Sequence, residues 1–167
     1  MIHKITIDLA IENLEDRGVT IEDIMDLVYD LQKPYVPDLK KETCRNHVMK
    51  VLAKREVQNA LLTGIELDRL AEKKQLSSPL QEIIASDEGL YGIDEIIALS
   101  IVNVYGSIGL TNFGYVDKLK PGIIGKLNEH EDIGNACHTF LDDIVGAIAA
   151  AASSRLAHSE EGAGVRD

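Results

Sequence analysis

Apolar residues spaced three and four positions apart, between glycine and proline stops, constrain the fold of this chain more than any other sequence feature. The segment from Ile21 to Leu31 shows the pattern, with Ile24 and Val28 between its ends. Such spacing places the apolar side chains on one face of a helix. The alternation that a strand requires is confined to the short stretch 2–7. The sequence therefore predicts an all-α fold, a compact bundle of several helices.

The chain is long enough for one domain with its own core. It has 167 residues, of which 45% are hydrophobic but only 4% aromatic, so aliphatic side chains must form most of that core. No proline- or serine-rich linker divides the sequence. We predict a single helical domain over residues 1–158 that ends in a largely apolar helix. The charged, glycine-rich stretch 159–167 is expected to be a disordered tail.

Local signals predict where several helices begin and break. Thr20 to Asp23 resembles a capping box, and Thr139 is suited to cap the last helix. Gly64 is expected to interrupt the helical stretch around it, because glycine weakens a helix interior. The three glycines within 106–114 predict an irregular segment there.

Charge and hydropathy exclude several classes of protein. A net charge of -11 argues against nucleic-acid binding, because phosphates would repel the chain. No uncharged apolar run reaches the roughly 20 residues of a membrane-spanning helix; the nearest, 96–110, is shorter and contains polar residues. Cys44 and Cys137 form no disulfide framework and no CxxC motif. We therefore expect a cytoplasmic protein with no transmembrane segment.

Two acidic pairs open strongly apolar helices. They are Asp94–Glu95 and Asp142–Asp143, each followed by a run of aliphatic residues. Carboxylates are rarely buried without a partner, and a divalent cation is one such partner. The alternative is that these acids only favour the positive end of the helix dipole. The sequence leaves both interpretations open.

Small residues follow the second acidic pair. Gly146 and the alanines over 147–152 would let another helix approach closely and bring Asp142 and Asp143 near a second acidic helix. Alanine is also simply the best helix former. A further alternative is that the Ala-rich helix packs in an interface with another chain.

An acid and a base three residues apart precede a proline. Asp117 and Lys120 stand just before Pro121. A lysine ammonium near a metal site can hold a phosphate oxygen as a point charge. The alternative is an exposed ion pair worth roughly a few tenths of a kcal/mol.

Taken in order, these elements resemble phosphatidylglycerophosphatase A. That family has an Asp–Glu helix, a segment with the pattern aromatic-x-Asp-x-x-Lys-Pro, and a helix opening with Asp-Asp-x-x-x-Gly. The corresponding stretches here are 93–96, 115–121 and 141–147. The resemblance is strongest over residues 90–157. The segment 54–64 is similar to the branch of the family found in Firmicutes.

The resemblance implies Mg²⁺-dependent removal of the terminal phosphate from phosphatidylglycerophosphate or a related phosphate monoester. The metal, Mg²⁺ or another divalent cation, would be held by Asp94, Glu95, Asp142 and Asp143. The catalytic groups would be Asp117, Asp142 and Asp143, and the substrate contacts Lys120, Arg55 and Asn59. The last two lie in a segment that also reads as an ordinary amphipathic helix.

Two other functions are left open by the sequence. An all-α nucleotide pyrophosphatase would place paired acids on facing helices, for which Glu12 with Glu15 and Glu22 with Asp26 come nearest. A non-catalytic helical interaction module would bind a partner or form a homo-oligomer. For the enzyme, a phospholipid head group and peripheral contact with a membrane are further expectations.

Overall fold

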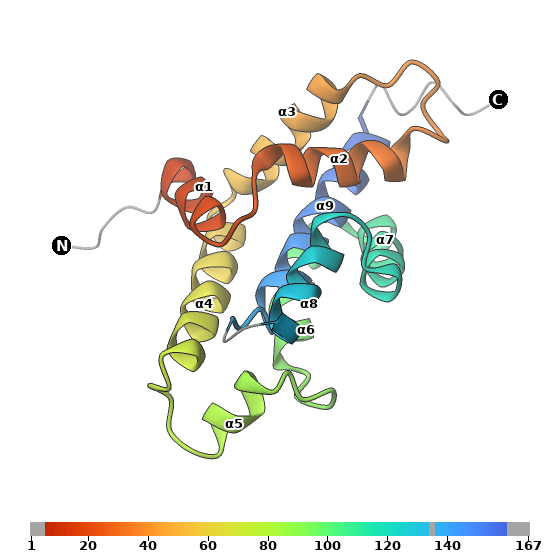
Figure 1. The fold of residues 1–167 in the computed structure, drawn as a ribbon. Helices are drawn as coiled ribbons and strands as arrows, with labels where there is room; N and C mark the ends of the chain where they lie inside the picture. The colour runs from red at the N-terminus through yellow and green to blue at the C-terminus, as the bar shows by residue number, and fades with distance from the viewer. Residues whose placement is uncertain (1–5, 134–135, 160–167) are drawn as a thin grey trace.

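The structure, a computed structural model, describes residues 6–133 and 136–159, and all regular secondary structure in these ranges is helical (Figure 1). In chain order the elements are α1 (Ile7–Asp16), α2 (Ile21–Gln32), α3 (Lys41–Leu52), α4 (Arg55–Glu72), α5 (Leu80–Ala85), α6 (Ile93–Val102), the 3₁₀ segment η1 (Asn103–Tyr105), α7 (Ser107–Leu119), α8 (Ile123–Ile133) and α9 (Leu141–Ala157). The predicted all-α bundle is confirmed. The predicted tail, apart from Ser159, lies outside the described residues.

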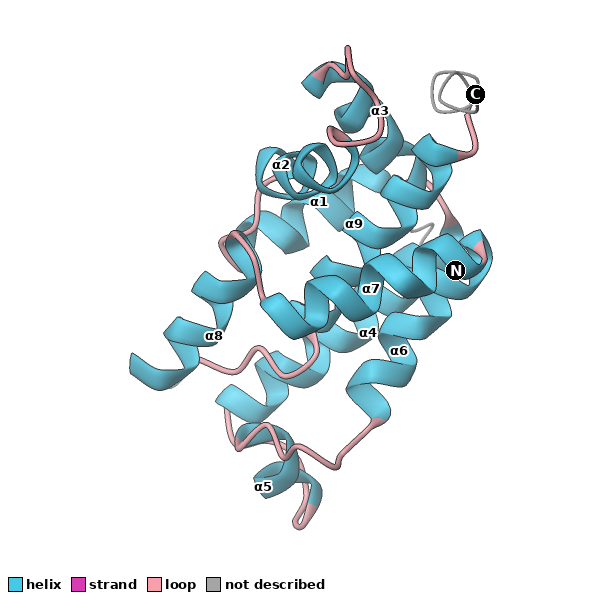
Figure 2. Cartoon of the chain, turned by 90° about the vertical axis from the view of Figure 1, so that its right-hand side faces the viewer, coloured by secondary structure: helices cyan, strands magenta, loops and turns pink. Residues whose placement is uncertain are grey.

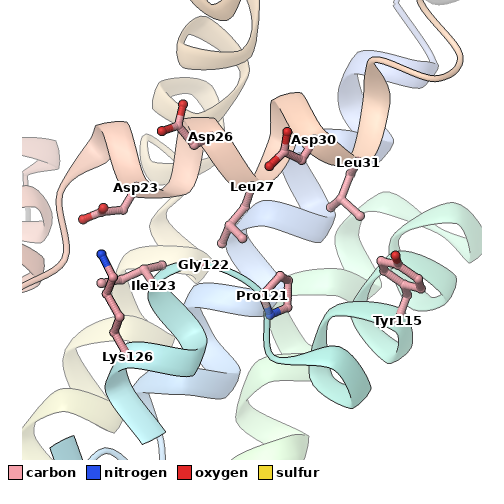
Figure 3. Close-up of a pocket in the computed structure, with 10 residues that line it drawn as sticks. All are labelled: Asp23, Asp26, Leu27, Asp30, Leu31, Tyr115, Pro121, Gly122, Ile123 and Lys126. Carbon is pink, nitrogen blue, oxygen red and sulfur yellow. The ribbon is translucent and has the colours of Figure 1, made fainter. Parts of the chain in front are cut away.

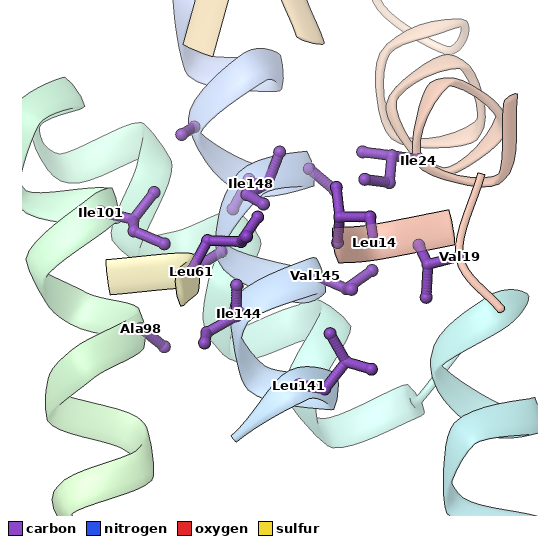
Figure 4. Close-up of a cluster of buried hydrophobic side chains, with 14 of the residues drawn as sticks. Leu14, Val19, Ile24, Leu61, Ala98, Ile101, Leu141, Ile144, Val145 and Ile148 are labelled. Carbon is purple, nitrogen blue, oxygen red and sulfur yellow. The ribbon is translucent and has the colours of Figure 1, made fainter. Parts of the chain in front are cut away.

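The last helix, α9, is the centre of the molecule. It packs against α2, α3, α4, α6, α7 and α8, which surround it in Figure 1. Every residue from 141 to 154 is buried. Ile144, Val145 and Ile148 point into an aliphatic core shared with α1, α2, α4 and α6 (Figure 4). The predicted largely apolar C-terminal helix is therefore the core itself, which explains why no position from 144 to 152 carries a polar side chain.

Small residues let the neighbouring helices approach α9 closely, as predicted. A Cβ on Gly146 would lie 3.4 Å from Val116 on α7 and 3.6 Å from Ile124 on α8. A Cβ on Gly109 would lie 3.0 Å from Val102 and 3.8 Å from Ser154. The alternative that this helix forms an interface with another chain is wrong, because its surface is already covered by its own chain.

The helix starts agree only in part with the sequence signals. The capping box is confirmed: the Asp23 backbone N–H donates to Thr20 Oγ1 at 3.2 Å, and the Thr20 N–H donates to the Asp23 carboxylate at 2.8 Å. Thr139 does not cap α9, because its hydroxyl donates to the carbonyl of Ile84 at 2.7 Å. The last helix also begins at Leu141, with Phe140 at its N-cap.

Glycine breaks neither of the helices in which a break was expected. α4 runs unbroken through Gly64, where a Cβ would lie 2.3 Å from Ile144 and 3.0 Å from Phe140. That glycine makes room for α9, so packing outweighs the helix propensity that it lowers. The stretch after Gly106 forms α7 instead of an irregular segment, because Phe113 and Val116 pack on α9.

No helix in the described ranges combines the length and the apolarity that crossing a membrane requires. The predicted absence of a membrane-spanning helix therefore holds for residues 6–133 and 136–159.

Candidate functional site

The first turn of α9 presents two buried carboxylates. Asp142 and Asp143 are only 5% and 6% exposed. The Asp143 N–H donates to Asp142 Oδ1 at 2.7 Å, which fixes the orientation of that carboxylate. The turn is held in place by Asp68 on α4, whose two carboxylate oxygens accept from the backbone N–H groups of Phe140 at 3.1 Å and Leu141 at 3.0 Å. Asp68 thus performs the capping role expected of Thr139.

The end of α7 places one ammonium group against these acids. Lys120 Nζ lies 2.7 Å from Asp117 Oδ1, 3.1 Å from Asp142 Oδ2 and 3.8 Å from Asp143 Oδ1. Asp117 and Lys120 are therefore not an isolated exposed ion pair. The three acids come from two helices, and the lysine joins those helices at the site.

The backbone at Lys120 explains how its side chain reaches α9. The residue caps α7 in the left-handed region, with φ 46° and ψ 51°, and its N–H donates to the carbonyl of Val116 at 2.8 Å. Gly125 on α8 allows this turn, since a Cβ there would lie 2.7 Å from the Lys120 carbonyl oxygen. Pro121 then prevents α7 from continuing.

Two further carboxylates face the same charges. Asp94, in the first turn of α6, is 9% exposed, and its charge raises the pKa of Asp143. Asp87 follows α5 in a turn with φ 48°. Burial chiefly, then Asp94, raises the pKa of Asp87, while Lys120 lowers it. Sequence reasoning missed Asp87, and the only local signal was an acid in a glycine-containing turn, where aspartate tolerates such dihedrals.

The site holds more negative charge than its lysine offsets. Burial raises the pKa of Asp143 above the usual range, and the neighbouring Asp142 raises it further. Burial also raises the pKa of Asp142, although Lys120 partly opposes this shift. Burial disfavours the Lys120 ammonium, but Asp142, Asp117 and Asp143 outweigh that effect and hold its pKa well above the usual value.

The donor chemistry of this site suits a hard divalent cation. Carboxylate oxygens are the ligands that Mg²⁺ prefers, and the surplus negative charge is what such an ion would neutralise. No three His, Cys, Asp or Glu side chains within the described part of the chain are grouped closely enough to hold a metal ion ready-made. Mg²⁺ usually binds one or two carboxylates and keeps several waters, so the residues fit it without a closed cage.

The remaining predicted site residues lie apart from this group. Glu95 is exposed, next to the buried Asp94. Arg55 and Asn59 are exposed near the start of α4. The site end of that helix is Asp68, about 20 Å from Arg55 at a rise of roughly 1.5 Å per residue. The structure therefore brings together Asp94, Asp117, Lys120, Asp142 and Asp143, but neither Arg55 nor Asn59.

An ion pair and its hydrogen bonds support the start of α9. Arg17 donates to Glu72 on α4 at 3.0 Å and to the carbonyl of Cys137 at 2.7 Å. The Cys137 N–H donates to Glu72 Oε1 at 2.8 Å. Burial raises the pKa of Asp68 to about 8, opposed by its two N–H donors and by Arg17. Sequence reasoning missed these residues, because their partners lie more than fifty positions away.

A pocket of about 270 Å³ lies behind the turn that follows Lys120 (Figure 3). It lies between α2 on one side and α7 and α8 on the other. Its lining residues are Asp23, Asp26, Leu27, Asp30, Leu31, Tyr115, Pro121, Gly122, Ile123 and Lys126. Its acids are already engaged: Asp23 caps α2, while Asp26 pairs with Lys41 and Asp30 with Lys33. This pocket does not share the carboxylates of the site.

The acid pairs expected of a nucleotide pyrophosphatase do not face each other across a site. Glu12 and Glu15 are exposed on α1. Glu22 forms an ion pair with Arg45, and Asp26 forms one with Lys41 at 2.7 Å. These acids belong to the surface of the protein.

Comparison with known proteins shows the family to which the chain belongs. Residues 17–158 match the family model of phosphatidylglycerophosphatase A, a longer stretch than the resemblance over 90–157. Protein YutG of Bacillus subtilis is 63% identical over 87% of this chain and 86% of its own length.

Two solved structures share the fold closely. A protein of unknown function from Bacillus stearothermophilus superposes with a TM-score of 0.90 at 63% identity, covering 94% of this chain and 96% of its own. The low temperature requirement C protein of Listeria monocytogenes gives 0.87 at 66% identity, covering 91% and 94%. With its motifs converging on one site and a family match along most of its length, the chain belongs to the phosphatidylglycerophosphatase A family.

Proposed function

We propose that this protein is a Mg²⁺-dependent phosphatase that removes the terminal phosphate from phosphatidylglycerophosphate or a related phosphate monoester. The observation that carries the proposal is the position of Lys120, within 3.8 Å of carboxylates from both α7 and α9. A phosphoryl group needs fixed positive charge beside it and an acid or base to handle protons. Family membership supports the reaction class.

The chain's own residues take distinct roles in this proposal. Lys120 offsets charge on the phosphate, and its neighbour Asp117 is the candidate base, because that carboxylate is more exposed than Asp142 or Asp143. One or two carboxylates among Asp142, Asp143 and Asp94 would hold the metal, and water would complete its coordination. Mg²⁺ bound there would neutralise phosphate oxygens.

Exposed apolar side chains beside the site support an amphiphilic substrate. Leu90, which is 92% exposed, and Ile93, which is 48% exposed, flank the entry to α6 next to Asp94. Large apolar side chains rarely stay so exposed without a contact to make, although single cases are ordinary. They suit the part of a phospholipid that adjoins its head group, so peripheral contact with a membrane belongs to the same proposal.

The test is a phosphate-release assay with purified protein, Mg²⁺ and three substrate sets: phosphatidylglycerophosphate in mixed micelles, small phosphate monoesters, and nucleoside triphosphates. Asp142→Asn and Lys120→Met should each lower kcat/KM by at least about a hundredfold, the usual scale for losing a preorganised charged group. Glu95→Gln and Asn59→Ala are matched controls, since both residues are exposed. Full turnover in both site variants would reject the assignment.

The same substrate sets separate the alternatives when a parallel reaction contains inorganic pyrophosphatase, which converts released pyrophosphate to phosphate. Release of pyrophosphate from nucleotides, with no release from monoesters, would favour the pyrophosphatase interpretation. Absence of all turnover, together with absence of Mg²⁺ binding by calorimetry, would favour an interaction module with an idle site.

A further inference from the structure

The outward face of α7 is unlike the other exposed helix faces of this protein. Its exposed positions follow one stripe at three- and four-residue spacing: Ser107, Leu110, Thr111, Gly114, Tyr115, Lys118 and Leu119. No acidic residue belongs to the stripe, although the chain has 28 of them. By contrast, the exposed positions of α2 include Glu22, Asp26 and Asp30. The helix lies at the front of the molecule in Figure 2.

Three large apolar side chains project from the stripe. Leu110, Tyr115 and Leu119 are 49%, 55% and 55% exposed, and Tyr115 also lines the pocket between α2 and α7. On the opposite side of the helix, Phe113 and Val116 are buried against α9. The core thus accounts for the inner face of α7 but not for the apolar residues of its outer face.

Gly114 adds a second, independent observation. A Cβ at this position would meet nothing within 4 Å, so the fold of the single chain does not require glycine there. Gly64 and Gly109 differ, because the fold places other side chains against them. Glycine weakens the middle of a helix. A glycine at the centre of the apolar stripe leaves a shallow gap between its neighbours on the helix surface. We expect a group from outside the chain to fill that gap.

Charge and spacing identify that group. Two molecules of net charge -11 repel each other, and the repulsion at a contact is least where the facing surfaces carry no carboxylates, as on the α7 stripe. A two-fold axis between positions 114 and 115 would cross two antiparallel copies of α7. It would pair Leu110 with the partner's Leu119, Thr111 with the partner's Lys118, and Gly114 with the partner's Tyr115.

This register is self-complementary, as a symmetric dimer requires. It sets leucine on leucine, seats the tyrosine ring over the gap at Gly114 and keeps the two Lys118 ammonium groups apart. Moving the axis by half a residue, onto Gly114, would instead set Leu110 against a lysine. We propose that the protein forms a symmetric dimer through antiparallel contact of the outward faces of α7. The proposal is independent of the catalytic one.

The first test measures oligomeric state by analytical ultracentrifugation of the full chain over a range of concentrations. The wild type should sediment at twice its chain mass of 18.3 kDa. Tyr115→Glu and Gly114→Glu should each raise the dimer Kd more than about tenfold, because each introduces a carboxylate twice into an apolar contact. Tyr35→Glu is the matched control: that tyrosine is 65% exposed and lies outside the stripe. Circular dichroism checks that every variant remains folded.

The second test addresses the register. Leu110→Cys chains mixed with Leu119→Cys chains should form a disulfide on mild oxidation much faster than either variant alone. In the proposed register two copies of position 110 stand nine residues apart along the antiparallel pair, about 13 Å, which is too far for a disulfide. The native Cys44 and Cys137 are both buried and should not interfere.

Three results would overturn the proposal. They are a wild-type chain that stays monomeric at every concentration, a dimer that Tyr115→Glu and Gly114→Glu leave intact, and Leu110→Cys chains that cross-link with themselves as fast as the mixture does. A monomer that floats with phosphatidylglycerol vesicles, and loses this binding in Tyr115→Glu, would assign the face to lipid instead.

Discussion

At the scale of the residue, the site balances one ammonium group against several carboxyl groups. Burial disfavours the ionised form of two of them, Asp142 and Asp143, and so raises the pKa of each. Lys120 contacts Asp117 and Asp142 directly, and Asp143 lies only slightly farther away. Asp87 and Asp94 add negative charge around them. A cation that binds to these carboxylates must therefore either displace the Lys120 ammonium group from them or bind beside it.

The protonation of Asp143 should make the stability of the metal-free protein depend on pH. Its pKa is higher in the folded chain than in the unfolded chain, because burial and Asp142 both disfavour its charge. The folded state therefore binds more protons, so its stability falls as pH rises above about 4, the unfolded value for aspartate. Asp143→Asn should flatten this fall by roughly 1–3 kcal/mol between pH 5 and 8.

Urea unfolding in EDTA at several pH values measures this effect. Asp117→Asn is a useful comparison, because that acid is more exposed and contacts the lysine directly. A wild type that gains stability from pH 5 to 8, with Asp143→Asn behaving identically, would contradict the charge balance described for the site.

The acids of this site differed in how far the sequence revealed them. Asp94, Asp142 and Asp143 were predictable, because an acid pair inside an apolar run is unusual in itself. Asp68 and Asp87 were not, since each gains its role from a partner distant in sequence: Asp68 from Phe140 and Leu141, and Asp87 from Lys120. Roles that depend on partners distant in sequence cannot be recognised from the local sequence.

At the scale of the element, the helical glycines fall into two kinds. At some, packing against a neighbouring helix determines the effect of a substitution on stability; at others, helix propensity does. Gly64→Ala should destabilise the protein by about 1–3 kcal/mol, because the new methyl group would overlap Ile144. Gly114→Ala should stabilise the folded monomer by up to about 1 kcal/mol, because the added methyl group meets nothing and alanine favours the helix.

Both variants lie in helix interiors, so each serves as the control for the other. Denaturant unfolding at low protein concentration, where association is minimal, gives the two free energies. Equal effects would mean that α4 and α9 are less closely packed than the contact at Gly64 indicates.

The same contrast explains which elements were predictable. The capping box at Thr20 depends on residues within one turn, so local sequence was enough. The continuity of α4 through Gly64, and the whole of α7, depend on contacts with α9. The local sequence shows a glycine at these places, but it does not show the neighbouring helix that packs against that glycine.

At the scale of the whole molecule, Mg²⁺ binding should appear as added stability. A ligand that binds only the folded state stabilises it by about 2.7 kcal/mol at one hundred times its Kd. Thermal unfolding should therefore shift to higher temperature with increasing Mg²⁺ in the wild type. The shift should disappear in Asp142→Asn, and the exposed Glu95→Gln serves as the control.

If Mg²⁺, Mn²⁺ and Ca²⁺ all leave the melting temperature of the wild type unchanged, the proposed divalent-cation site at these acids is contradicted. K⁺ at equal ionic strength controls for general screening, which is substantial for a chain of net charge -11.

The burial of α9 from residue 141 to residue 154 ties two properties together. Its first turn carries two acids of the site, and the rest of it is the core. Opening that turn would uncover the interior, so its amide hydrogens should exchange with solvent only when the entire chain unfolds. If the proposed phosphatase activity is correct, substitutions that change its substrate preference should therefore occur in α6, in α7 and in the turn before α6, and not in α9.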